Sequence, residues 1–156
     1  MSDFSFLAQH KVSDESQDTD HDIIIYPVGE EDIKIAIEKL ETNLPVELHQ
    51  FYQQCGYGFF NRSTGNINRF MDPFSLTQIN LKLDEFEFDP DLEVYQDLYN
   101  HDKLLFFEVN EGLYLAMNKI DDGGKNAIYC MDIRVSDALV DFLKAFLENP
   151  DLLNEL

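Results

Sequence analysis

The chain has no tryptophan, only two cysteines, and only 11 lysines and arginines among its 156 residues. Two cysteines are too few for the dense disulfide framework of small secreted domains, and no apolar run approaches the roughly 20 residues that a membrane-spanning helix needs. Residues 1–16 lack the basic segment and continuous apolar segment of a secretory signal. We therefore expect a cytoplasmic protein that makes no membrane contacts.

The shortage of positive charge is equally informative. The 11 basic residues face 31 acidic ones, which gives a net charge of −20 and an isoelectric point near 4.2. Binding to nucleic acid or to an anionic membrane depends on lysine and arginine, so neither partner is expected. An acidic surface steers a basic protein partner towards it. Negative charge also simply keeps proteins soluble, and composition alone favours that simpler explanation.

What the sequence does contain predicts one compact α+β domain. It is 44% hydrophobic and has 13 phenylalanines and seven tyrosines, which favours a core of packed aromatic rings. We expect a flexible acidic arm over residues 1–21, with at most one turn near its start, a folded domain over 22–149 and a short tail over 150–156. Helical patterns precede a run of strands and a last helix capped by Ser136. This order predicts an antiparallel β-meander with helices packed around it.

The segment 44–60 has the clearest local pattern. Pro45 suits the first position of a helix, because its fixed φ and missing N–H cost nothing there. Gly56 is placed to end that helix with a positive φ, and the residues from Gly58 enter a strand. Apolar residues at positions i, i+3, i+4 and i+7 predict one buried helix face, made of Leu48, Phe51, Tyr52 and Cys55. Both cysteines, at positions of this apolar kind, are expected to be buried free thiols.

This segment resembles the signature of the SUKH superfamily, which includes Smi/Knr-type cell-wall regulators of fungi and many bacterial immunity proteins. The segments 68–73 and 136–143 resemble later family motifs and occur in the family's order, so the likeness covers roughly residues 30–148. The residues that carry the signature are Leu44, Pro45, Phe51, Tyr52, Gly56, Gly58, Phe59, Asn68, Arg69 and Asp72. The resemblance implies a SUKH-like α+β fold and a role in binding rather than catalysis.

No motif predicts a catalytic residue, a metal site or a cofactor. The four histidines are scattered, and no HExxH or CxxC spacing brings two metal ligands together. Residues 121–124 lack the alternating acids of a calcium loop and predict a β-turn. The serines do not lie in a nucleophile elbow, and no phosphate-binding glycine loop is present.

Two places remain as candidate sites. Arg69 and Asp72 are close enough in sequence to form an ion pair that fixes a turn to the core. A second place is an acid-rich stretch, whose partner-binding candidates are Asp84, Glu85, Glu87, Asp89, Asp91 and Glu93. Alternation in this stretch would bury Phe86 and Phe88 and project the acids on one side.

The acid-rich stretch has a simpler interpretation that is at least as well supported. It would be a solvated loop, with acids that favour the positive end of the following helix. If it does form a binding face, Asp97 and Glu108 are candidates to extend it.

Taken with the resemblance, the charge favours a non-enzymatic immunity protein that binds and neutralises a cognate secreted toxin with a basic surface. A different class is a regulatory scaffold of the Smi/Knr type with no toxin partner. A third possibility, an enzyme, would need a deep pocket with converging polar groups.

Overall fold

The structure, a computed structural model, describes residues 1–13 and 21–156. Within these residues seven strands form one antiparallel sheet, in which each strand pairs with the next along the chain. The strands are β1 (Ile24–Tyr26), β2 (Tyr57–Phe59), β3 (Arg69–Phe70), β4 (Lys103–Asn110), β5 (Leu113–Asn118), β6 (Ile128–Cys130) and β7 (Ile133–Ser136). The α-helices are α1 (Glu30–Leu40), α2 (Val46–Gln54), α3 (Pro73–Asn80), α4 (Pro90–Tyr99) and α5 (Leu139–Glu148). The predicted α+β meander is confirmed.

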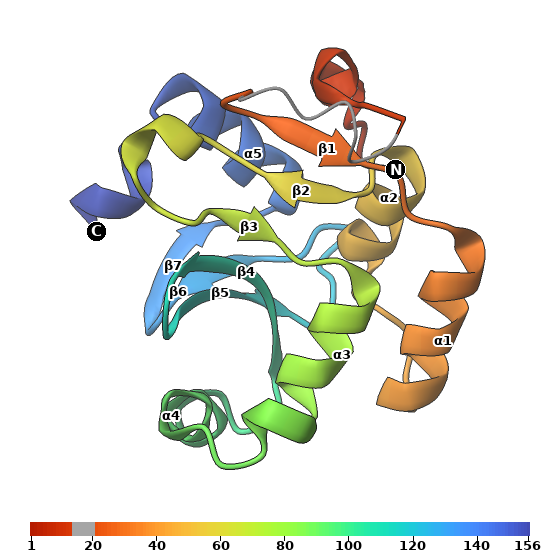
Figure 1. The fold of residues 1–156 in the computed structure, drawn as a ribbon, viewed down its shortest axis with the longest axis vertical. Helices are drawn as coiled ribbons and strands as arrows, with labels where there is room; N and C mark the ends of the chain where they lie inside the picture. The colour runs from red at the N-terminus through yellow and green to blue at the C-terminus, as the bar shows by residue number, and fades with distance from the viewer. Residues whose placement is uncertain (14–20) are drawn as a thin grey trace.

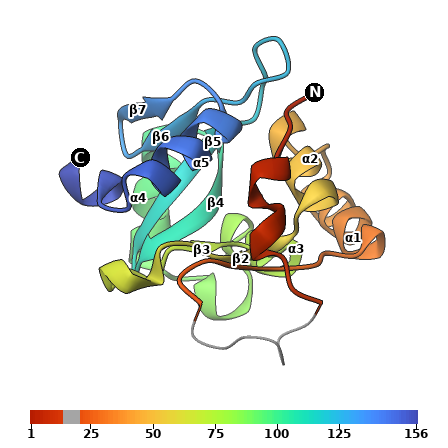
Figure 2. The same cartoon turned by 90° about the horizontal axis from the view of Figure 1, so that it is seen from above.

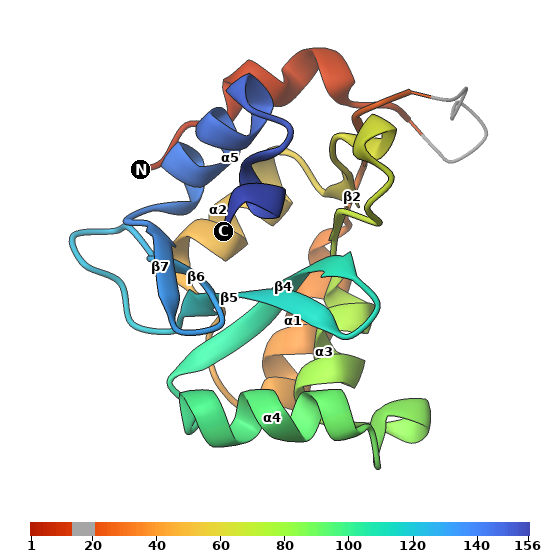
Figure 3. The same cartoon turned by 90° about the vertical axis from the view of Figure 1, so that its left-hand side faces the viewer.

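Helices cover both faces of the long β4–β5 hairpin (Figures 1 and 3). On one face, α5 packs Phe142 and Phe146 against Phe107 of β4, with ring centroids 6.3 and 6.0 Å apart. On the other face, α4 places Tyr95 edge-on to Tyr114 of β5 at 5.7 Å. Helices α1 and α3 pack against each other. Helix α4 therefore lies at one end of the molecule, opposite the N-terminal segment (Figure 3).

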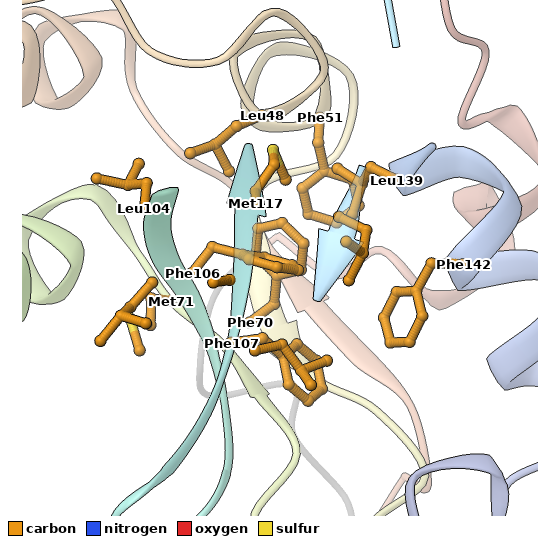
Figure 4. Packing of buried hydrophobic residues seen from close by; sticks show 14 of the residues in the cluster. Leu48, Phe51, Phe70, Met71, Leu104, Phe106, Phe107, Met117, Leu139 and Phe142 are labelled. Carbon is orange, nitrogen blue, oxygen red and sulfur yellow. The ribbon is translucent and has the colours of Figure 1, made fainter. Parts of the chain in front are cut away.

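The core is built from aromatic rings, as the composition predicts. Phe70 of β3 stacks on Phe51 of α2 with centroids 4.1 Å apart and meets Phe106 of β4 edge-on at 5.3 Å. Leu48 and Met117 surround these rings (Figure 4). Because offset-stacked and edge-on ring pairs are the favoured geometries, this cluster joins α2 to the sheet.

The signature segment forms the predicted helix and strand, with one correction at its start. Helix α2 begins at Val46, and Pro45 is its N-cap residue, with φ −49° and ψ 141°. The prediction that Pro45 is the first helical residue was therefore wrong by one position, because ψ of that residue is extended. The predicted buried face is confirmed, since Leu48, Phe51, Tyr52 and Cys55 are all buried.

The two glycines of the signature are required by the approach of a neighbouring strand. Gly56 has a φ of 141°, and a Cβ atom there would lie 1.8 Å from the carbonyl oxygen of Tyr26. A Cβ atom on Gly58 would lie 2.0 Å from the carbonyl oxygen of Ile24. Both oxygens belong to β1, so glycine is what allows β1 to pair with β2.

The N-terminal residues differ from the flexible arm that the sequence predicted. Residues Ser5–His10 form the 3₁₀-helix η1, which lies beside α2 (Figure 2). Phe4 and Leu7 are buried, and the Phe4 ring meets Phe51 edge-on at 5.2 Å. Two buried side chains thus dock this segment on the core, while its other residues are exposed or half-buried. The acids at 14, 15, 18 and 20 lie outside the described residues.

The beginning of the last helix was also predicted incorrectly. Ser136 ends β7, a strand that the sequence did not predict, and α5 begins at Leu139 after Ala138. The first N–H groups of α5 donate to the carboxylate of Glu47 in α2, at 2.8 Å from Leu139 and 3.2 Å from Val140. A side chain distant in sequence therefore caps α5 in place of the expected serine.

Candidate protein-binding surface

The acid-rich stretch forms the connection between α3 and α4. Two residues with positive φ, Lys82 at 52° and Asp84 at 51°, turn the chain after α3, and the Leu83 N–H donates to Gln78 at 2.9 Å. The 3₁₀-helix η4 (Asp84–Phe86) follows, and Asp89 then caps α4 by accepting the Asp91 N–H at 2.9 Å. We call residues 84–93 the acidic segment. It lies at the end of the molecule where α4 begins (Figure 3).

Helix α4, which contains the last residues of this segment, is fixed to the sheet by two tyrosines. The Tyr95 hydroxyl accepts the Tyr114 N–H at 2.9 Å, and the Tyr99 hydroxyl donates to the Met131 carbonyl at 2.9 Å. Burial raises the pKa of both Tyr95 and Tyr99, so these phenols remain neutral at physiological pH. The acidic segment is therefore presented from a rigid support.

The six predicted partner-binding acids do not all remain available to a partner. Asp84, Glu85, Glu87 and Asp91 are exposed, and within the described residues their side chains form no hydrogen bond or ion pair. Asp89 is half-buried because it caps α4. Glu93 lies 3.6 Å from the Lys82 ammonium, which neutralises part of its charge. Four carboxylates thus stand free in the acidic segment.

The predicted burial of both phenylalanines was wrong. Phe86 packs partly against the core, whereas Phe88 is 82% exposed. The prediction assumed a strand with period two, but residues 84–86 form a 3₁₀ turn with about three residues per turn, so residues two apart do not share a face. The result is an exposed aromatic ring between acidic neighbours, which the sequence pattern did not indicate.

The expected ion pair between Arg69 and Asp72 was also wrong. The Arg69 Nε lies 3.4 Å from a Glu108 carboxylate oxygen, across the β3–β4 pair, and the guanidinium donates to Ser75 at 3.4 Å. Asp72 instead accepts the Ser75 N–H at 3.2 Å as the N-cap of α3. A cap bond satisfies the aspartate locally, while strand pairing brings Glu108 to the arginine. Glu108 therefore does not extend the acidic segment as a free acid, whereas Asp97 is exposed on α4.

The other signature residues have structural contacts. The Tyr52 hydroxyl donates to the Met71 carbonyl at 2.6 Å, and complete burial raises the pKa of this phenol. Asn68 is buried with a φ of 47° and donates to Asn61 and Thr64 within the turn between β2 and β3. These contacts join α2 to the segment after β3 and hold the turn between β2 and β3.

The residues considered for chemistry are positioned structurally as well. The thiol of Cys55 is buried and free, and burial raises its pKa to about 11, the opposite of an activated nucleophile. Residues 121–124 form the predicted turn, in which Asp121 accepts the Gly124 N–H at 2.9 Å. In the part of the chain that the structure describes, no three histidine, cysteine or acidic side chains lie together as metal ligands. None of its helices is long and apolar enough to cross a membrane.

Three features of the structure were not predicted from the sequence. It did not identify Glu47, because a single glutamate on a helix gives no sign of a distant partner. It did not predict the exposure of Phe88, since an aromatic residue next to acids is equally compatible with burial. It also missed Lys82, the base that the fold pairs with Glu93.

Comparison with known proteins supports the resemblance seen in the signature segment. The profile of the SMI1/KNR4 family (SUKH-1) matches residues 27–149. A protein of Bacillus subtilis (strain 168) named "Immunity protein YxxD" is 36% identical over 156 residues, which covers 97% of this chain and 98% of that protein. No solved structure matches the chain at a significant level. The match over most of the chain, together with the signature and the α+β meander, shows that the protein belongs to the SMI1/KNR4 family (SUKH-1).

Proposed function

We propose that this protein is an immunity protein, which binds a toxic protein and blocks it through the acidic segment. The observation that carries the proposal is the pairing of four free carboxylates with the exposed ring of Phe88 on a rigid support. The relative named as an immunity protein aligns along nearly the whole of both chains, so the role is proposed for the entire domain. The partner would be a protein toxin with a basic surface.

The two parts of the surface would contribute differently to binding. Exposed carboxylates attract a basic partner over several ångströms and mainly raise the association rate. An aromatic side chain that becomes buried in the partner is one of the few residues that contribute most of the affinity, and it mainly slows dissociation. Phe88 is the exposed aromatic of the acidic segment and is therefore the proposed anchor.

Inhibition would be steric and electrostatic, with no chemical step. If the toxin acts on nucleic acid, its substrate groove is basic, and the acidic segment at the start of α4 can occupy that groove. The support from α4 limits the conformational entropy lost on binding, since Tyr95 and Tyr99 already fix this helix to the sheet.

The test begins with affinity capture of partners from the native organism, combined with the identity of the neighbouring gene. The binding constant of the captured toxin is then measured for Phe88→Ala and for the control Phe74→Ala, a 64% exposed phenylalanine on α3. Loss of a hot-spot aromatic costs about 2 kcal/mol, so Phe88→Ala should weaken binding about thirtyfold through faster dissociation.

Charge is tested separately with the double reversal Glu85→Lys and Glu87→Lys, against Glu30→Lys and Glu31→Lys on α1. The first pair should slow association and reduce its dependence on salt, while the second should have a smaller effect. Equal effects of the two pairs would contradict the acidic segment as the contact surface. Capture of a partner with no toxic activity would instead support a regulatory scaffold.

A further inference from the structure

A cavity of about 300 Å³ lies between α3, α4 and the start of β4. Its walls combine polar side chains with apolar ones, which include Ile79, Leu92, Tyr95 and Leu104. This volume is at the lower end of the range for small-molecule sites.

No acidic side chain of the described residues lines this cavity. Its basic residues are Lys82, Lys103, Lys119 and His101, which we call the basic rim. Three of the chain's 11 lysines and arginines thus gather at one cavity, in a protein with 31 acidic residues.

Two of the rim lysines have no acidic partner. Lys82 pairs with Glu93, but among residues 1–13 and 21–156 no carboxylate lies within ion-pair distance of Lys103 or Lys119. The Lys103 ammonium lies over the rings of Tyr129 and Tyr99, at 4.2 and 5.5 Å from their centroids. A cation–π contact leaves the N–H donors of an ammonium available to an anion.

Three neutral polar groups of the cavity wall are already engaged within the protein. The Asn80 side chain donates to the Leu105 carbonyl at 2.8 Å and accepts the Leu105 N–H at 2.9 Å. The hydroxyls of Tyr95 and Tyr99 are bonded to the backbone of Tyr114 in β5 and of Met131 after β6. A ligand would therefore meet aromatic and aliphatic surface, the polar side chains of Thr42 and Gln96, and the lysine ammonium groups at the rim.

The backbone around the basic rim adopts conformations that cost free energy. Lys82, Asn100 and His101 have positive φ values of 52°, 46° and 68°. Such conformations are uncommon for residues other than glycine, and they concentrate at binding sites where the surrounding structure holds them in place. Here they lie just after the C-terminal ends of α3 and α4, where the chain turns beside the rim.

We propose that this cavity binds a small organic anion, an aromatic or apolar body that carries a phosphate or carboxylate group. The body would fill the apolar interior and the anionic group would contact Lys103 and Lys119. The net charge of −20 does not exclude such a ligand, because salt screens distant acids beyond about 8 Å at physiological ionic strength. This site does not depend on toxin binding and is proposed in addition to it.

Phenyl phosphate is the probe, because it combines one aromatic ring with one phosphate group. Its two halves, phenol and inorganic phosphate, serve as comparison ligands, and benzoate distinguishes a carboxylate from a phosphate. In ¹H–¹⁵N NMR titrations of the whole chain, phenyl phosphate should shift the amide signals of Leu92, Tyr95 and Leu104. It should bind at least about tenfold more tightly than either half, since both types of contact contribute.

The decisive variants remove the unpaired rim charges. Lys103→Gln combined with Lys119→Gln should weaken binding of phenyl phosphate about tenfold, the effect expected for lost charged hydrogen bonds. Lys34→Gln on the exposed side of α1 changes the net charge in the same direction and should leave the affinity unchanged. If loss of the Lys103 ring contacts impairs folding, the affinity for phenyl phosphate is measured for the single variant Lys119→Gln instead. An unchanged affinity in the rim variants, equally tight binding of phenol, or signals that shift only elsewhere would overturn the proposal.

Discussion

Replacing Glu47 by glutamine is the most direct test of how this fold is held together. The carboxylate is completely buried and lies at the start of α2. One of its oxygens accepts the N–H groups of Asn126 at 2.7 Å and Leu139 at 2.8 Å. The other accepts the Val140 N–H at 3.2 Å and the Ser2 hydroxyl at 2.8 Å. One side chain thus joins four separate parts of the chain.

The expected loss of stability follows from these four bonds. Glutamine keeps one accepting oxygen but presents an NH₂ group in place of the other oxygen. At least one of the backbone N–H groups that now donate to Glu47 would then face a donor. An unsatisfied buried donor costs about 1–3 kcal/mol, and loss of the negative charge at the N-terminus of α5 adds up to about 2 kcal/mol. We expect Glu47→Gln to lower the free energy of unfolding by about 3 kcal/mol.

Urea unfolding followed by far-UV circular dichroism measures this difference directly. Glu31→Gln is the matched control, because it removes the same charge from an exposed position in the first turn of α1. Its effect should stay within about 0.5 kcal/mol. If Glu47→Gln were as mild as this control, the buried carboxylate would not be a main support of α5, and the reasoning would be refuted.

Two further predictions concern the signature segment. Gly58→Ala should lower the free energy of unfolding by at least about 2 kcal/mol, because the added Cβ would lie 2.0 Å from the β1 backbone. The control Gly29→Ala, whose added Cβ would have its nearest neighbour at 3.6 Å, should be nearly neutral. Equal urea midpoints of the two variants would contradict the close approach at Gly58. Burial raises the pKa of Cys55 from 9.0 to about 11, so across this range the folded protein keeps a proton that the unfolded chain has lost, and stability falls as pH rises. The wild type should therefore lose more stability between pH 9 and 11 than Cys55→Ala does, whereas parallel urea curves would show that the thiol is not involved.

Helices whose ends depend on local interactions can be located from the sequence. Asp72-Pro73 and Asp89-Pro90 are each an N-cap aspartate followed by a proline, and α3 and α4 begin at these prolines. An aspartate side chain reaches N–H groups two or three residues away, so the sequence contains the whole interaction. The same holds for the buried face of α2, whose 3.6-residue period is visible in the chain.

The strand β7 was missed for a physical reason. The four residues Ile133–Ser136 do alternate apolar and polar side chains, but the run is very short, and Ile133 is exposed like Arg134 while the other two residues are half-buried. Its pairing with β6 provides the hydrogen bonds. Strands of this kind are defined by their neighbour in the sheet, which a single sequence does not identify.

The acidic segment illustrates the same limit at the candidate site. The sequence located the acids, but only the folded chain determined which of them are free. Glu93 is paired with Lys82 and Asp89 caps a helix, whereas Phe88 is exposed because the chain turns as a 3₁₀-helix. The basic rim was not predicted, since its residues come from the turn after α3, the loop before β4, the first residue of β4 and the loop after β5, and meet only around the cavity.

The sequence by itself determined the family, the α+β class, the aromatic core and the helices whose caps are local. The tertiary structure alone decided that Glu47 caps a helix 92 residues away, that Arg69 pairs with Glu108, and that Phe4 and Leu7 of the N-terminal segment pack into the core. The division has one physical reason. Interactions between residues within one or two turns leave a periodic or positional pattern in the chain, whereas interactions between distant residues depend on the path of the whole backbone.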